Sequence, residues 1–183
     1  MTIGLTALER IARARSNFRM GVGVVLCSGK DQWLAAPSET VTVERFLAMR
    51  EMGVMELTIT DWRAQTLSTW ATDGDIARLA LPQDKGLDWV RSVCDPSDDL
   101  NAPFKGPFTP IFGGIVEAHR TALAICKMSL LLPSAVLVNV SGQNLEGVDF
   151  IDLKLISKAM QSSINQLTEV SVANVPLKVS NAS

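Results

Sequence analysis

His119 is the only histidine in this chain of 183 residues, and it lies close to Glu117 and Arg120. A neutral imidazole can act as a general base or bind a metal ion. The alternative for a lone histidine is packing in the core or contact with solvent. Because the chain has no tyrosine, any proton transfer must use His119, a carboxylate, a lysine or a cysteine.

Two further groups of side chains could do chemistry. Asp95, Asp98 and Asp99 are close enough in sequence to bind a divalent cation through oxygen ligands, or else to form a solvated acidic loop. Cys27 would be reactive only if its thiolate were stabilised, and Lys30 is the nearby cation that could do so. Neither group identifies a reaction by itself.

Other motifs argue against common site types. The three cysteines are scattered (Cys27, Cys94 and Cys126), so together with one histidine they do not give the paired spacing of a zinc site. The glycines at 21 and 23 follow a predicted helix and open a strand, which is the reverse of a phosphate-binding loop. Gly113 and Gly114 do precede a helix, where free N–H groups could bind an anion or simply start the helix.

Composition excludes several classes of protein. The chain has 17 basic and 19 acidic residues and 47% hydrophobic residues, so neither a general nucleic-acid binder nor a disordered chain is expected. No stretch of 18 uncharged apolar residues exists, and no membrane span is predicted. The first 20 residues lack the features of a secretory signal; their arginines allow a transit peptide, but an ordinary surface helix is favoured. Unpaired thiols then indicate a cytoplasmic protein.

Hydrophobic periodicity predicts alternating helices and strands in a single compact domain, with a core over about 5–167. Helices are expected at 5–18, from 43 to Gly53, from an N-cap at Asp61 to about 69, at 86–93, 115–132 and 149–167. Strands are expected at 21–28, 33–36, 54–60, 76–81 and 135–140, the last buried on both faces. The fold class is therefore α/β or α+β, a mixed sheet with flanking helices. The four tryptophans are expected in the core or half-buried.

Two segments have no strong periodicity. Residues 95–114 contain four of the eight prolines, which predicts a long loop of the kind that often carries function. Residues 168–183 are expected to form an extended, connector-like segment.

The order of these segments adds a resemblance. The stretches LERIARARSNFRMGVGVVL and LAAPSETVTVERFLAMREMGVMELTIT, followed by GGIVEAHRTALAICKMSLLLPSAVLV, resemble 3,4-dihydroxy-2-butanone 4-phosphate synthase over roughly residues 7–178. The likeness extends to the divergent synthase-like domain at the N-terminus of some bacterial GTP cyclohydrolase II proteins. There LTEVSVANVPL (167–177) would be the connector to the cyclohydrolase domain. The resemblance implies the synthase fold, a homodimer and a link to riboflavin biosynthesis.

The chain departs from the synthase pattern where the family binds Mg²⁺ and substrate. The family's acidic loop corresponds to residues 27–32, which hold one carboxylate, Asp31. The family's metal-binding histidine opens the long helix; the corner at Pro133 places Ala118 opposite it, and a one-residue shift would place His119 there. Since Mg²⁺ requires several oxygen ligands, this set of residues is poor for the reaction.

Three hypotheses follow. The first is a catalytically degenerate synthase-like domain without a cofactor, the N-terminal module of a GTP cyclohydrolase II type protein, acting in dimerisation or docking. The second is an active Mg²⁺-dependent lyase that converts ribulose 5-phosphate to 3,4-dihydroxy-2-butanone 4-phosphate and formate with Asp31, Glu117 and His119. The third is an unrelated domain that binds a small molecule under the 95–114 loop.

Overall fold

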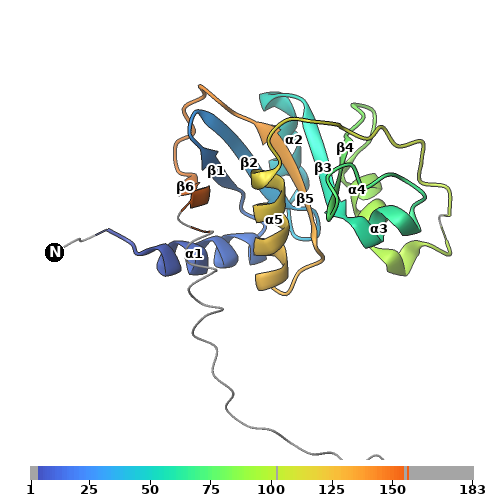
Figure 1. The fold of residues 1–183 in the computed structure, drawn as a ribbon, viewed down its shortest axis with the longest axis horizontal. Helices are drawn as coiled ribbons and strands as arrows, with labels where there is room; N and C mark the ends of the chain where they lie inside the picture. Colours follow the sequence, from blue (N-terminus) through green and yellow to red (C-terminus); the bar gives the residue numbers. More distant parts are fainter. Residues whose placement is uncertain (1–3, 102, 155, 157–183) are drawn as a thin grey trace, which may run out of the picture.

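The computed structural model describes residues 4–101, 103–154 and 156. These residues form a six-stranded mixed sheet with helices on both faces, as Figure 1 shows, so the predicted fold class is confirmed. The strands are β1 (Val24–Ser28), β2 (Asp31–Pro37), β3 (Met55–Thr60), β4 (Ile76–Ala80), β5 (Ser134–Asn139) and β6 (Asp149–Asp152). The helices are α1 (Ala7–Arg19), α2 (Val43–Met52), α3 (Asp61–Thr66), α4 (Leu87–Cys94), the 3₁₀ turn η1 (Pro96–Asp98) and α5 (Glu117–Met128).

The strands lie in the order β4-β3-β5-β2-β1-β6. All neighbouring pairs are antiparallel except β1 and β6, which run parallel. The expected hairpin between β1 and β2 is present, and Ser28 pairs with Asp31 across its turn. Gly29 occupies this turn with φ +63°, a conformation that glycine adopts without steric cost. The second strand is longer than the predicted 33–36 because pairing with β1 continues to the turn.

Side chains that alternate along the strands build one core on each face of the sheet. Val24 and Leu26 of β1 pack into the core under α1 and α5, whereas Val25 packs into the core under α2 and α4. In β5, Leu137 points to the first core and Val138 to the second, and both are fully buried. β5 is therefore the strand buried on both faces that its continuous apolar sequence predicts.

Polar side chains mark where the helices begin. Thr6 and Glu9 form a reciprocal capping box at the start of α1, which satisfies backbone N–H groups that have no partner within the helix. Thr42 caps α2 by accepting a hydrogen bond from the N–H of Arg45. The predicted N-cap of α3 is wrong by one residue: Thr60 accepts the capping hydrogen bond, and Asp61 is the first helical residue.

The predicted helix over 149–167 is wrong at its start. Residues 149–152 form β6, whose register pairs Phe150 with Val25 and Ile151 with Leu26 of β1. The edge of β1 offers backbone hydrogen bonds to residues 149–152, and these favour a strand. The hydrophobic pattern of residues 149–167 alone contains no information about this distant edge. The described residues 153, 154 and 156 are helical. The predictions for 157–167 and for the connector-like segment 168–183 lie outside the described residues.

Two other expectations require correction. The helix predicted over 115–132 is shorter, because α5 ends at Met128 and the chain then turns through Leu130 at φ +61°. Trp62 and Trp70 are not packed in the core: their exposed fractions are 79% and 77%. Trp62 lies on the short α3 and Trp70 in the loop that follows it, where no described element covers them.

The proline-rich segment 95–114 is mainly the predicted loop, but its second half is fixed against the sheet. The N–H of Ala80 donates to the carbonyl of Thr109 at 2.9 Å, and the N–H of Ile111 donates to the carbonyl of Arg78 at 2.8 Å. The segment thus covers the free edge of β4 before it leads into α5. Within the described residues, no helix combines the length and the apolar character that crossing a membrane requires.

Replacement of Leu137 by alanine tests the central position of β5. Leu137 is fully buried, so Leu137→Ala should lower the free energy of unfolding by about 2–5 kcal/mol. Leu100→Ala is the matched control, since Leu100 is 95% exposed and its loss should change stability by less than about 0.5 kcal/mol. Urea denaturation measures both. Equal midpoints for the two variants would contradict the placement of β5 at the centre of the core.

Candidate functional site

The structure separates the three residues predicted for the lyase reaction. Asp31 is the first residue of β2 and is half-buried, Glu117 opens α5 and is exposed, and His119, two residues later, is completely buried. In the part of the chain that the structure describes, no hydrogen bond or ion pair joins any two of them. Their roles in catalysis stay predictions.

His119 instead faces the sheet and contacts Glu56 of β3. The Nε2 atom lies 2.9 Å from Oε2 of Glu56, and because an ionised carboxylate only accepts hydrogen bonds, Nε2 is the donor. The ring of Trp33 packs edge-on against the imidazole, with 4.8 Å between ring centroids. The other ring nitrogen, Nδ1, is buried and has no partner among the described residues. His119 is thus oriented by Glu56 and Trp33, and protein atoms enclose it.

Arg78 of β4 completes the group around Glu56. Its side chain is 3% exposed, and Nη1 lies 4.0 Å from Oε2 of Glu56. Nε donates to Oδ2 of Asp73 at 2.8 Å, and Nη2 donates to the carbonyl of Gly113. We call Glu56, Asp73, Arg78 and His119 the His119 cluster. It joins β3, β4, the loop before β4, the loop before α5, and α5 itself.

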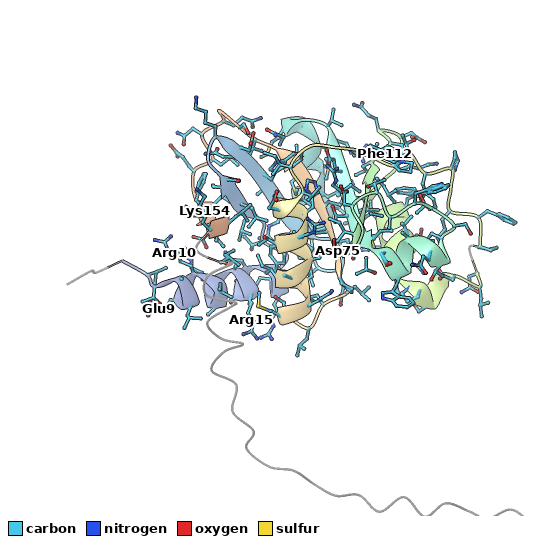
Figure 2. The ribbon with its side chains drawn as sticks, in the orientation of Figure 1. Glu9, Arg10, Arg15, Asp75, Phe112 and Lys154 are labelled. Atoms are coloured by element: carbon cyan, nitrogen blue, oxygen red, sulfur yellow. The ribbon has the colours of Figure 1, made fainter. Side chains whose placement is uncertain are left out.

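The charge of Arg78 determines the state of Asp73. Burial raises the pKa of Asp73, but hydrogen bonds from Arg78 and Thr72 and the positive charge of Arg78 outweigh it, so the pKa lies below its ordinary value. Asp75 lies close to α5 (Figure 2), where Nε of Arg120 donates to its Oδ1 at 2.8 Å. Nη2 of Arg120 also donates to the backbone carbonyl of Asp73.

The positive charge of Arg78 disfavours the binding of Mg²⁺ at Glu56. Among the described residues, no three His, Cys, Asp or Glu side chains lie together as a set of metal ligands. Mg²⁺ needs near-octahedral oxygen coordination, but the carboxylate of Glu56 already contacts an imidazole and lies close to a guanidinium. That fixed positive charge would repel a second cation.

Sequence reasoning missed Glu56, Asp73 and Arg78. The two strands did contain a signal, since each has a charged residue among apolar ones. Glu56 precedes the buried Leu57 within MELTIT, and Arg78 lies in the otherwise apolar strand IARLA. A charged residue inside an apolar strand needs a buried partner. The sequence alone did not show that β3 and β4 would be neighbours.

Asp95 and Asp99, two acidic residues of the 95–114 segment, bind partners within the protein. Asp99 forms ion pairs with Arg63 and Lys105, and the carboxylate of Asp95 accepts a hydrogen bond from the N–H of Ser97 at 2.8 Å. The described structure therefore gives neither a solvated acidic loop nor a cation site at these two residues.

The two remaining motifs also have structural explanations. Burial, followed by the negative charge of Asp152, raises the pKa of the Cys27 thiol, so the reactive thiolate is disfavoured. Gly113 and Gly114 adopt φ +71° and +80°, and the carbonyl of Gly113 accepts from Arg78. These glycines shape the turn that leads to α5.

The described structure resembles solved enzymes of one kind. It matches a cation-free 3,4-dihydroxy-2-butanone 4-phosphate synthase with a TM-score of 0.60 and 15% identity, over 84% of this chain and 98% of that chain. This is the 3,4-dihydroxy-2-butanone 4-phosphate synthase fold. A synthase in complex with two magnesium ions gives a TM-score of 0.59 and 16% identity, over 86% of this chain and 99% of that chain.

A third similar structure is a two-domain 3,4-dihydroxy-2-butanone 4-phosphate synthase from A. baumannii. It gives a TM-score of 0.57 and 11% identity, over 80% of this chain and 56% of that chain. No family model matches the sequence, and no curated protein matches it. At these identities the comparisons establish the synthase fold.

Replacement of Asp73 by asparagine tests the electrostatics of the His119 cluster. Asp73→Asn should lower the free energy of unfolding at pH 7 by roughly 1–3 kcal/mol, because Arg78 would remain buried without its carboxylate. The folded-state pKa of Asp73 is lowered, so its contribution is present above the unfolded pKa, about 3.9, and disappears as the pH falls below it. The variant should therefore lose less stability than the parent as the pH falls below about 4.

Asp75→Asn is the control for this measurement. Asp75 forms an ion pair with Arg120, but its side chain is 64% exposed, and exposed pairs contribute about 0–1 kcal/mol. Chemical denaturation of both variants across this pH range compares the two positions. An Asp73→Asn profile identical to that of Asp75→Asn would rule out a buried ion pair at Arg78.

Proposed function

We propose that this chain is a catalytically degenerate synthase-like domain associated with riboflavin biosynthesis, which acts in dimerisation or docking. The observation that carries the proposal is the His119 cluster. The only histidine of the chain is fully buried, its Nε2 is bonded to Glu56, and Arg78 lies beside the same carboxylate. A general base must reach the proton that it removes, directly or through one water. Burial of His119 supports a role in joining α5 to the sheet.

The active lyase remains the alternative. It would require Asp31, Glu117 and His119 to hold Mg²⁺ and to act on ribulose 5-phosphate. Against it, one of the three is buried and paired with Glu56, another is exposed, and no contact joins them. The magnesium-bound synthase has this fold, but a shared fold does not carry over the residues that perform the chemistry.

The proposal includes a place in a larger protein. The A. baumannii synthase has two domains, and this chain covers 56% of its length, so the fold does occur beside a second domain. For this chain we propose a GTP cyclohydrolase II type domain after the C-terminal segment. Such a module would contribute to assembly through its surface and would need no cofactor of its own.

Formate release from ribulose 5-phosphate separates the two functions. With Mg²⁺ present, the protein should release no more formate than the same mixture containing EDTA, because His119 is fully buried against Glu56 and, among the described residues, no contact joins it to Asp31 or Glu117. A magnesium-dependent 3,4-dihydroxy-2-butanone 4-phosphate synthase serves as the positive control. Formate production that depends on Mg²⁺ and disappears in His119→Ala would establish the lyase and refute degeneracy.

The mass of the protein in solution tests the proposed dimer. The surface of the 95–114 segment carries large apolar side chains: Phe104 and Phe112 are 98% and 73% exposed, and exposed apolar groups favour covered interfaces. Sedimentation equilibrium should give twice the chain mass of 19.8 kDa. A single species with the chain mass at all concentrations would contradict self-association.

A further inference from the structure

Three hollows lie in a row around α3 and the end of α4, at the end of the molecule opposite to α1 (Figure 1). The first, of about 620 Å³, and the second, of about 240 Å³, share Thr66 in their linings. The second and the third, of about 230 Å³, share Cys94 and Leu132, whereas the first and the third share no residue. The second hollow therefore lies between the other two. We call the three hollows together the α3 groove, and no residue of the His119 cluster lines it.

The lining of the α3 groove is rich in flat rings. Three aromatic residues and four prolines contribute to it, and the aromatic ones are Trp62, Phe104 and Phe108. Trp62 and Phe104 are 79% and 98% exposed, so their rings are open to a ligand. Phe108 packs against Trp89, with 6.1 Å between the ring centroids. Flat rings of this kind stack on other flat apolar groups, so the groove offers a ligand a succession of stacking surfaces.

The charges along the α3 groove are balanced within the protein. Its lining contains three basic and three acidic residues, which are Arg63, Arg91, Lys105, Glu39, Asp95 and Asp99. The side chains of Arg63 and Lys105 are 9% and 3% exposed, and both form ion pairs with Asp99. A ligand with a net charge would lose part of its hydration without gaining an uncompensated partner. The groove therefore favours a neutral ligand.

Trp62 is the side chain of the central hollow that keeps a hydrogen-bond donor for a ligand. Its indole Nε1 has no hydrogen-bond partner among the described residues, and an indole N–H can only donate. The hydroxyl groups beside it are bonded within α3: Oγ1 of Thr60 accepts from the N–H of Arg63, and Oγ1 of Thr66 donates to the carbonyl of Trp62. A ligand of this hollow must therefore place a flat apolar group on the indole ring and an acceptor at its N–H.

We propose that the α3 groove binds a proline-rich segment of a partner protein in the polyproline II conformation. Such a segment has no net charge, presents flat pyrrolidine rings and exposes its backbone carbonyls as acceptors, while its prolines bring no N–H donors. These properties fit the balanced charges, the rings and the free donor of the groove. A proline of the segment lies against the ring of Trp62, a neighbouring carbonyl accepts from Nε1, and the extended chain continues into the adjoining hollows. The inference rests on the docking role in the proposed function and gives that role a kind of partner.

Binding of a capped, fluorescently labelled decaproline peptide to the full chain tests the proposal. Fluorescence anisotropy should show saturable binding of decaproline, whereas a capped glycine–serine peptide of the same length, which is neutral but has no rings, should not bind. Trp62→Ala should weaken the binding of decaproline at least about tenfold, because it removes both the stacked ring and the donor. Trp70→Ala is the matched control: Trp70 is 77% exposed but lines none of the three hollows, so its loss should leave the affinity unchanged. Because both side chains are exposed, neither variant should unfold the protein.

Trp62→Phe separates the hydrogen bond from the stacking. It keeps a ring but removes the N–H, so the affinity for decaproline should fall by about threefold to tenfold, and an unchanged affinity would refute the bond to the peptide carbonyl. Absence of saturable decaproline binding, or equal losses in Trp62→Ala and Trp70→Ala, would refute the site. If Trp62→Ala instead lowered the mass in sedimentation equilibrium to that of one chain and no peptide bound, a second copy would occupy the groove and the proposal would be wrong. A protein that releases no formate and binds no decaproline would remain a degenerate domain and would lose only this kind of partner.

Discussion

The guanidinium of Arg78 is the group on which the arrangement of this fold most depends. A cation with 3% of its side chain exposed must find acceptors on every side, and Arg78 finds them in Asp73, Glu56 and the carbonyl of Gly113. Those partners belong to different parts of the chain. The interaction fixes β3 against β4 and places the turn from which α5 begins, so the position of His119 is a consequence of where Arg78 lies.

Local patterns in the sequence predict most of the elements. The continuous apolar run at 135–140 correctly predicted β5, and Thr42 correctly predicted the start of α2. Burial on two faces and helix capping can both be recognised from a short stretch of sequence. The start of the predicted helix at 149–167 failed for a reason that is not local. Whether Asp149 begins a strand depends on the open edge of β1, which lies far away in the sequence.

The candidate site shows the same division. The sequence singled out His119 as a candidate, but the surroundings of its side chain are set by Glu56 and Arg78. These two residues belong to strands that pair only in the folded sheet. Similarly, the acidic residues of the proline-rich segment were recognisable as a group. The pairing of Asp99 with Arg63 and Lys105 was not recognisable. It follows from the packing of α3 against this segment. Reactive groups are visible in a sequence, whereas their partners are set by topology.

The parallel pairing of β6 with β1 has a consequence for how the protein is made. The carboxylate of Asp149, at the start of β6, binds Arg13 and Asn17 of α1, and Asn17 and Asp149 are 132 positions apart in the chain. During synthesis on the ribosome, β1 must therefore wait with one edge unpaired until nearly all of the described residues have emerged. A nascent chain arrested before β6 would present this edge to other strands, so β6 protects the edge of β1.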